Sequence, residues 1–223
     1  MINFCTLFDS RYISRGLALY ESLRRHCENF HIYFFAFNDE CYRILSKLAL
    51  KGSTVISLCE FEDEQLLAAK ATRSSMEYCW TCTPSIIRYT LDTYNLASCT
   101  YLDADLYFFG RPELLLDELR DNSVMITEHR YTPCYDKSKK SGKYCVQFMT
   151  FKNNGAAKKA LNWWRDACND WCYARHENGK FGDQKYLDDW LERFEQVHVL
   201  EHPGGGLAPW NIQQYYILSL IHI

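Results

Sequence analysis

The sequence predicts an α/β protein in which a parallel sheet is covered by helices. Short apolar runs at 2–8, 31–37 and 54–58 have the length of buried strands. Segments with helical spacing of apolar residues separate them, and the order strand, helix, strand is typical of parallel strands joined by crossover helices. The 223 residues, 48% of them hydrophobic, are enough to bury one full core.

The first half of the chain contains the clearest helix signals. Helices are predicted from about 14, from 38 or 39 to about 52, over 62–70 and from 83 onward. Asn38 or Asp39 can cap the second of these. Thr83 and Pro84 resemble an N-cap followed by proline at the first helical position, which predicts the start of the fourth.

The second half continues with one long helix and more short strands. Strands are predicted at 101–109, 123–127, 144–151 and 197–200, and helices at 112–119, from 153 or 154 to about 172, and from 182–184 to about 194. Because no repeat or linker interrupts the sequence, we expect a single domain over 1–223. The run 215–223 is apolar to its last residue, which indicates a domain truncated at its carboxyl end or a tail that docks as an edge strand.

Net charge and cysteine usage narrow the functional classes. A formal net charge of -3 gives no basic face for nucleic acid. The amino terminus lacks a signal-peptide pattern, and no stretch approaches the roughly 20 apolar residues of a membrane span. Eleven cysteines without an export signal favour reduced thiols in the cytoplasm. Cys79 and Cys82 lack a second pair at zinc-site spacing, so neither a zinc nor a redox role is expected. The lysine-rich segment 137–143 is interpreted as a solvated loop, with a contact for an anionic substrate or membrane surface as the alternative.

Two acids interrupt the apolar segment 101–109, which reads YLDADLYFF. On a strand, Asp103 and Asp105 would point to the same side, because side chains alternate with a period of two. Two neighbouring carboxylates repel each other unless a cation lies between them. Mg²⁺ and Mn²⁺ prefer carboxylate oxygens and keep positions open for phosphates. The alternative is a strand that runs into a turn with two solvated acids, and the pattern alone does not separate these interpretations.

Four segments along nearly the whole chain resemble a known family. They read FDSRYISRGLALYESL, TPSIIRYTLD leading into YLDADLYFF, FGDQKYLDDW, and HPGGGLAPWN. Together they are similar to the GT-A-fold glycosyltransferases, and most similar to the family 8 group of retaining enzymes that use UDP-sugars with manganese. The resemblance implies a nucleotide-diphospho-sugar transferase fold, with a central, mostly parallel, twisted sheet and helices on both faces.

The resemblance assigns three ligands to a Mn²⁺ or Mg²⁺ ion that bridges the diphosphate of the donor. These are Asp103, Asp105 and His202, and the histidine keeps the family's spacing to Gly205 and Trp210. The alternative interpretation of His202 is a polar residue that caps a loop.

The resemblance also assigns residues to the nucleotide and the sugar. Thr6, Asp9 and Tyr12 would line the uridine pocket, with the tyrosine stacked on the base. Arg88 would reach the phosphate or the sugar of the donor, with a surface arginine as the alternative. The nucleotide-sugar-binding set is completed by Asp103, Ala104 and Gly205.

Asp183 and Gln184 are the implied catalytic pair. Asp183 would hold hydroxyl groups of the donor sugar, and Gln184 would offer an amide, in place of a carboxylate nucleophile, near the anomeric carbon. We therefore expect a same-face displacement in which the leaving phosphate helps to deprotonate the acceptor hydroxyl. Ala208 departs from the family pattern, which has a phosphate-contacting lysine two residues before the tryptophan of the last segment.

The implied function is transfer of a hexose from a nucleotide-diphosphate donor, expected to be a UDP-sugar, to a saccharide or lipid-linked saccharide acceptor, with retention. The resemblance suggests bacterial polysaccharide biosynthesis in the cytoplasm or at the inner face of the membrane, with peripheral contact at most. Two alternatives stay open: a catalytically impaired nucleotide-sugar-binding domain of the same fold, and a D-x-D phosphatase. The phosphatase is disfavoured because its motif normally opens the chain and carries threonine or valine where Tyr107 stands.

Overall fold

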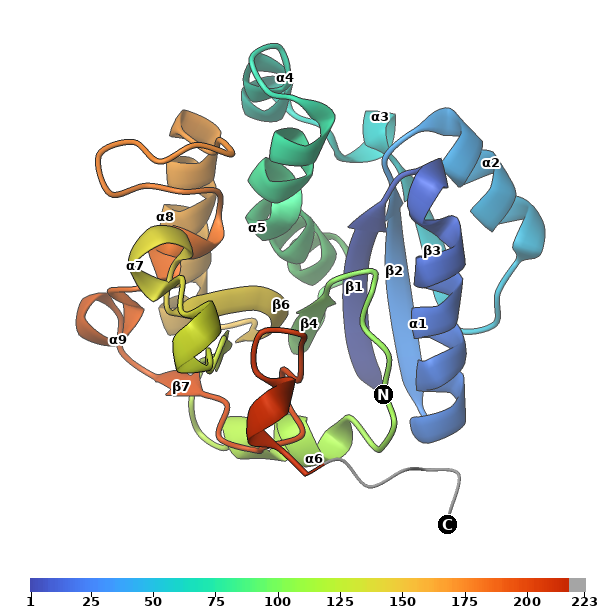
Figure 1. Ribbon diagram of the computed structural model, residues 1–223. Coiled ribbons are helices and arrows are strands. Elements are labelled where there is room, and N and C mark those ends of the chain that lie inside the picture. Colours follow the sequence, from blue (N-terminus) through green and yellow to red (C-terminus); the bar gives the residue numbers. More distant parts are fainter. Residues whose placement is uncertain (217–223) are drawn as a thin grey trace.

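The computed structural model describes residues 1–216 and contains one seven-stranded sheet of order β3-β2-β1-β4-β6-β5-β7 (Figure 1). The strands are β1 Ile2–Phe8, β2 Phe30–Ala36, β3 Ser53–Ser57, β4 Ser98–Leu102, β5 Val124–Glu128, β6 Tyr144–Lys152 and β7 Val197–Val199. Strands β1 to β4 are mutually parallel, and β5 is parallel to β7. Only β6 runs antiparallel to its neighbours among the described strands. The prediction of a mostly parallel sheet is therefore confirmed.

Helices cover both faces of this sheet. They are α1 Ile13–His26, α2 Asp39–Leu48, α3 Leu58–Phe61, α4 Glu64–Lys70, α5 Ser75–Thr93, α6 Glu113–Leu116, α7 Ser138–Ser141, α8 Gly155–Asp170 and α9 Trp190–Arg193. Helices α1 and α2 pack on one face, and α5 and α8 pack on the other (Figure 1). No helix within residues 1–216 is long and apolar enough to cross a membrane.

Strand β1 shows why the sequence forms a two-faced core. Its side chains alternate, so that Phe4 and Phe8 belong to the apolar cluster with α1 and α2, whereas Cys5 and Leu7 belong to the cluster with α5 and α8. All four are buried. An apolar run without alternation is what a strand covered on both faces requires.

Helix α5 begins nine residues before the predicted start at Thr83 and Pro84. Ser74 is its N-cap and forms a capping box with Glu77, whose carboxylate accepts a hydrogen bond of 2.9 Å from the backbone N–H of Ser74. This S-x-x-E pattern stands in the sequence and outweighs the threonine–proline pair. Pro84 lies inside the helix and is buried there.

Two predicted elements are shorter than expected. Strand β4 ends at Leu102, and the N–H of Leu106 then donates to the carbonyl of Asp103 (3.1 Å), which closes a turn. Asp103 and Asp105 therefore lie in a turn and not on a strand. The expected helix from 182–184 to 194 is broken into a 3₁₀ turn, Gln184–Leu187, and the single turn α9.

The other boundaries differ less. Asn38, and not Asp39, caps α2, and this helix ends with Ala49 in the left-handed conformation before 51–52. The helix predicted over 62–70 is α4, capped by Asp63, with the separate turn α3 before it. Of the predicted apolar tail, 217–223 lies outside the described residues.

The early start of α5 can be tested by removing its cap. We expect Ser74→Ala to lower the free energy of unfolding by about 1 kcal/mol, because the N-terminal turn loses its side-chain acceptor. Ser75→Ala is the matched control, since Ser75 is exposed and serves as no cap, and surface changes of that kind stay within about 0.5 kcal/mol. Urea unfolding of the three proteins measures both values. Equal stabilities for the two variants would contradict the assigned start.

Candidate active site

The strand order reverses at β1, and this reversal marks the candidate site. From β1 the chain moves outward to β2 and β3, and it then returns to place β4 on the other side of β1. Asp9 follows the carboxyl end of β1, and Asp103 follows the carboxyl end of β4. Open α/β sheets bind their ligands in the crevice outside such a switch point.

Asp103 is held in place by its own strand and by the neighbouring one. Its N–H donates to the carbonyl of Gln147 on β6 (2.9 Å), and the hydroxyl of Tyr101 donates to its Oδ1 (2.8 Å). Burial, assisted by the charge of Asp105, raises the pKa of Asp103 to about 6, while the Tyr101 hydroxyl acts in the opposite direction. Asp105 is exposed.

Asp183 reaches the same place from a distant part of the sequence. Its side chain is buried, and its backbone carbonyl accepts a hydrogen bond from the indole of Trp164 on α8 (3.0 Å). Burial and then the negative charge of Asp103 raise its pKa to about 7, against the lowering effect of the Thr83 hydroxyl on α5. Asp103 and Asp183 thus form a pair of carboxylates that repel each other.

The acids at this edge would suit a cation, but the three predicted metal ligands are not grouped together. A divalent ion would offset the burial that raises the pKa values of Asp103 and Asp183, together with the charge of the neighbouring acid in each case. Within residues 1–216, however, no three His, Cys, Asp or Glu side chains are grouped so that they could hold a metal ion. Asp103, Asp105 and His202 are therefore not assembled as one ligand set in this structure.

His202 is engaged in the loop that contains it. The ring Nδ1 of His202 accepts a hydrogen bond from the backbone N–H of Gly204 (3.0 Å), and the backbone N–H of His202 donates to the carboxylate of Glu118 (2.8 Å). In the neutral ring the proton then belongs on Nε2. Binding a cation through Nε2 would move that proton to Nδ1, and binding through Nδ1 would displace the backbone N–H. Either route requires the hydrogen bond to Gly204 to break.

The glycine-rich segment around His202 is fastened by one arginine. The guanidinium of Arg130 donates to the carbonyls of Leu200, His202 (3.1 Å) and Gly205 (3.2 Å). A Cβ added to Gly205 would lie 2.3 Å from a methyl carbon of the buried Leu200, so any larger residue would have to displace that side chain. Gly205 therefore has a structural reason for its place, beside the nucleotide-binding role that the family resemblance implies.

The residues predicted for the nucleotide lie on and after β1, with Ala104 buried beside Asp103. Thr6 is fully buried, and its hydroxyl has no hydrogen-bond partner within the described chain. Asp9 accepts hydrogen bonds from the backbone N–H and the Nε of Arg11 (both 2.9 Å). Tyr12 is 43% exposed, as a ring that stacks on a base must be.

Gln184 contacts the lysine-rich segment. Its Nε2 donates to the carbonyl of Ser141 (2.6 Å), and Asp188 accepts from the N–H of Lys143 (2.7 Å). The segment contains the short helix α7 and docks through backbone groups on the turn after Asp183. Its four lysines are exposed, which agrees with the prediction of a solvated segment. The Ser141 carbonyl orients the side-chain amide of Gln184.

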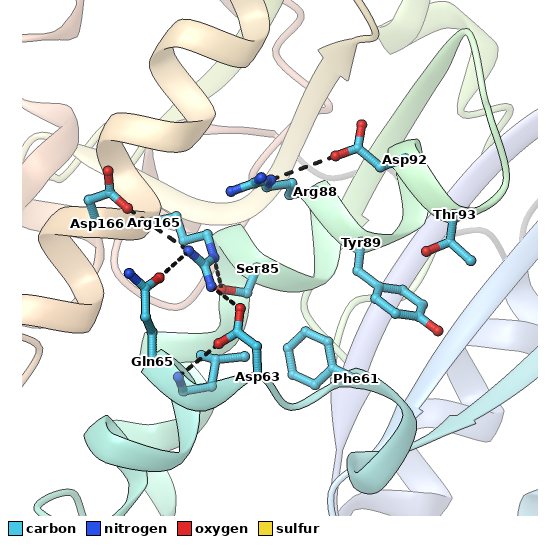
Figure 2. A pocket seen from close by; sticks show the side chains of 11 residues that line it. Phe61, Asp63, Gln65, Ser85, Arg88, Tyr89, Asp92, Thr93, Arg165 and Asp166 are labelled. Carbon is cyan, nitrogen blue, oxygen red and sulfur yellow. Dashed lines mark hydrogen bonds and ion pairs between the residues drawn. The ribbon is translucent and has the colours of Figure 1, made fainter.

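Arg88 lies away from the acids. Thr83 faces Asp183, and a residue five positions later points about 140° around the helix from it. Arg88 is exposed and approaches Asp92 (Nε to Oδ2, 3.6 Å). It lines a cavity between α4, α5 and α8 (Figure 2). The alternative of a surface arginine describes this position better than a donor contact does.

Sequence reasoning missed several supporting residues. Tyr101 stood in the recognised segment and Thr83 was interpreted as a cap, although both contact the acids. Gln147 and Arg130 gave no local signal, because their partners are backbone groups of segments remote in sequence.

The architecture has known counterparts. The chain superposes on the glycosyltransferase GlyE of Streptococcus pneumoniae TIGR4 with a TM-score of 0.56 and 19% identity, over 90% of this chain and 45% of GlyE. The galactosyltransferase LgtC, solved with donor and acceptor sugar analogs, gives 0.55 and 12%, over 89% of this chain and 73% of LgtC. A second LgtC structure, of an active-site mutant with glutamate in place of glutamine, gives 0.54. The protein therefore has the GT-A glycosyltransferase fold, and it spans less than half the length of GlyE.

Sequence comparison then identifies the family. The protein YfnD of Bacillus subtilis strain 168 is 31% identical over 222 residues, which are 96% of this chain and 70% of YfnD. YfnF of the same strain is 30% identical over 220 residues, covering 95% of this chain and 73% of YfnF. The chain belongs to the family of YfnD and YfnF, both described as uncharacterized. No family model matches the chain.

The repulsion between the two carboxylates predicts how stability depends on pH. The folded state keeps protons on Asp103 and Asp183 at pH values where the unfolded chain has released them. The stabilisation of the folded state by these two protonated acids is therefore fully present below about pH 4 and is lost as the pH rises to about 7. In a chelating buffer, the free energy of unfolding should fall by about 1 kcal/mol or more between pH 5 and pH 8.

Asp183→Asn should remove most of this fall, because a neutral amide does not titrate. Asp121→Asn, at an exposed acid remote from the site, should keep the wild-type slope. Denaturant unfolding at several pH values gives the slopes, and a wild-type slope in Asp183→Asn would show that the carboxyl is not perturbed.

Proposed function

We propose that this protein is a glycosyltransferase that moves a sugar from a nucleotide-diphosphate donor, with a UDP-sugar as the expected donor, to a saccharide or lipid-linked saccharide. The observation that carries the proposal is the pair Asp103 and Asp183, two carboxylates with raised pKa values at the switch point of a GT-A fold. Such pairs are typical of functional sites, where structure maintains a charge arrangement that costs stability.

A divalent cation is part of this proposal. Asp103 and Asp105 would hold it, and His202 would join them after giving up its hydrogen bond to Gly204. When bound, Mn²⁺ or Mg²⁺ supplies positive charge that stabilises the departing diphosphate. The protein's own contribution is to keep Asp103 oriented through Tyr101 and Gln147.

Gln184 supports retention as the stereochemical outcome. Its amide adjoins Asp183, and the Ser141 carbonyl already takes one of its N–H groups, which leaves the amide oxygen and the second N–H to face the sugar. LgtC also has a glutamine in its active site, the one replaced in its glutamate mutant, which agrees with an amide in this role. An amide is a poor nucleophile, so we favour a same-face displacement over a covalent intermediate. A glycosyl adduct trapped on a carboxylate would contradict this choice.

A binding domain without turnover is the second candidate function. Ala208 stands where a phosphate-contacting lysine would be expected, and it is buried, with its N–H bonded to the side chain of Asn211 (2.9 Å). The loop therefore brings no cation of its own to that position. Slow hydrolysis of a UDP-sugar to UDP would exclude this candidate, whereas tight binding without any turnover would favour it.

The decisive experiment is calorimetry with UDP, with and without Mn²⁺. We expect binding that requires the ion and that weakens at least about tenfold in Asp103→Asn and in Asp105→Asn, because each variant removes one carboxylate ligand. Asp121→Asn is the control that loses one exposed acid without touching the site.

Three results would each change the proposal. Equal binding of UDP in chelator would remove the metal role of the two acids. Wild-type affinity for UDP in both variants would show that UDP binds at a different site. No binding of UDP or other nucleoside diphosphates would overturn the donor class altogether.

A further inference from the structure

A groove lies on the other side of α5 from the acids. Its central cavity, of about 540 Å³, is lined by α4, α5 and α8, including Ser85, Arg88 and Arg165 (Figure 2). A cavity of about 570 Å³ adjoins it and shares Gln65 and Asp166, and a smaller one shares Arg88 and Asp92. The three cavities therefore form one continuous groove along α8.

Arg165 builds the floor of the groove. Its guanidinium side chain is only 8% exposed. The Nε donates to Ser85 (3.1 Å), one Nη donates to Gln65 (2.6 Å), and the other pairs with Asp63. Asp63 also caps α4 by accepting from the N–H of Leu66 (3.0 Å). Because every group of this network has a fixed partner, the floor is rigid before any ligand arrives.

Within residues 1–216, two residues of the groove have polar groups that lack a full set of hydrogen-bond partners. Arg88 contacts Asp92 only through Nε, and Figure 2 shows its guanidinium directed into the cavity. Asn169 lines the adjoining cavity, and both polar atoms of its side chain lack a hydrogen-bond partner in the part of the chain that the structure describes; they lie beneath the surface, so a ligand reaches them only after this side chain rotates. An amide of this kind needs a partner that both donates and accepts.

The charges of the groove are balanced. Arg73, Arg88, Lys158 and Arg165 are matched by four aspartates in the same lining. A balanced lining disfavours nucleic acid and other strongly charged ligands. Arginine and lysine only donate hydrogen bonds, and ionised aspartate only accepts them. A hydroxyl group does both, so adjacent hydroxyls satisfy such alternating groups at once.

We infer that this groove binds a neutral, hydroxyl-rich glycan at a site separate from the acids. The binding itself does not depend on the proposed reaction. Only the further identification of this glycan as the chain that the enzyme extends rests on the proposed function. The groove and the acids are separated by α5, which offers Thr83 to one and Ser85 with Arg88 to the other.

The test uses defined oligosaccharides on the whole chain. Maltotetraose and cellotetraose represent α- and β-linked neutral glycans, and trigalacturonic acid represents a charged one. Binding is followed by calorimetry and by chemical-shift changes of arginine Nε–H and backbone signals. We expect at least one neutral oligomer to bind and to shift the signals of the groove. Arg88→Ala and Asp166→Ala should each weaken it about tenfold, since each removes a charge-assisted hydrogen bond.

Matched variants separate this site from the donor site. Arg43→Ala removes an exposed arginine on α2 and should leave glycan binding unchanged. Asp103→Asn should also leave it unchanged, even if UDP binding is lost, so that the two proposals fail independently. Arg165 is avoided because its removal would take away the partner of Gln65 and of one Asp63 oxygen in the floor, so that a loss of binding would not distinguish a lost contact from a disturbed fold.

The outcomes that overturn the inference are distinct. The inference is overturned if both neutral oligomers fail to bind at millimolar concentration. It is also overturned if binding is unaffected in both Arg88→Ala and Asp166→Ala. Preference for trigalacturonic acid would replace the neutral class by an anionic one. Loss of glycan binding in Asp103→Asn would assign the glycan to the donor site.

Discussion

The burial of two neighbouring acids, Asp103 and Asp183, is the constraint on which the candidate site depends. Within residues 1–216, the cations of the neighbouring segments are committed to other partners: Arg11 to Asp9, and Lys185 to Asp188. The guanidinium of Arg130 donates its hydrogen bonds to backbone carbonyls of the glycine-rich loop. The two acids therefore keep their raised pKa values, and the fold carries this cost without compensation from the chain itself.

Arg165 shows the opposite arrangement in the same molecule. It is buried on the other side of α5, but each of its three guanidinium nitrogens has a partner, so its charge is compensated within the chain. A buried cation with a full set of partners is typical of structure, whereas buried acids without a counter-ion are typical of function. The comparison explains why the acids, and not the fully paired arginine, mark the candidate site.

The sequence predicted the alternation of strands and helices well, because each of those signals is local. Asn38 and Asn154, for example, cap α2 and α8 through their own backbone neighbours. The position of Arg88 could not be predicted in the same way, because the side of the helix that faces the acids is decided by how the helix packs in the tertiary fold. Arg130 acts on a loop about seventy residues later, and only the tertiary fold brings the two together.

Helix α5 connects these observations. Its helical spacing sets the directions of its residues relative to one another, since each residue turns the helix by about 100°. Thr83 faces Asp183, and Ser85 and Arg88 face the groove. A start at Thr83 would leave Glu77 and Trp80 outside the helix, and Trp80 packs against Phe181 just before the acids. The capping box therefore adds the turns that carry Glu77 and Trp80, whereas the spacing of residues along the helix decides which side chains reach the acids and which reach the groove.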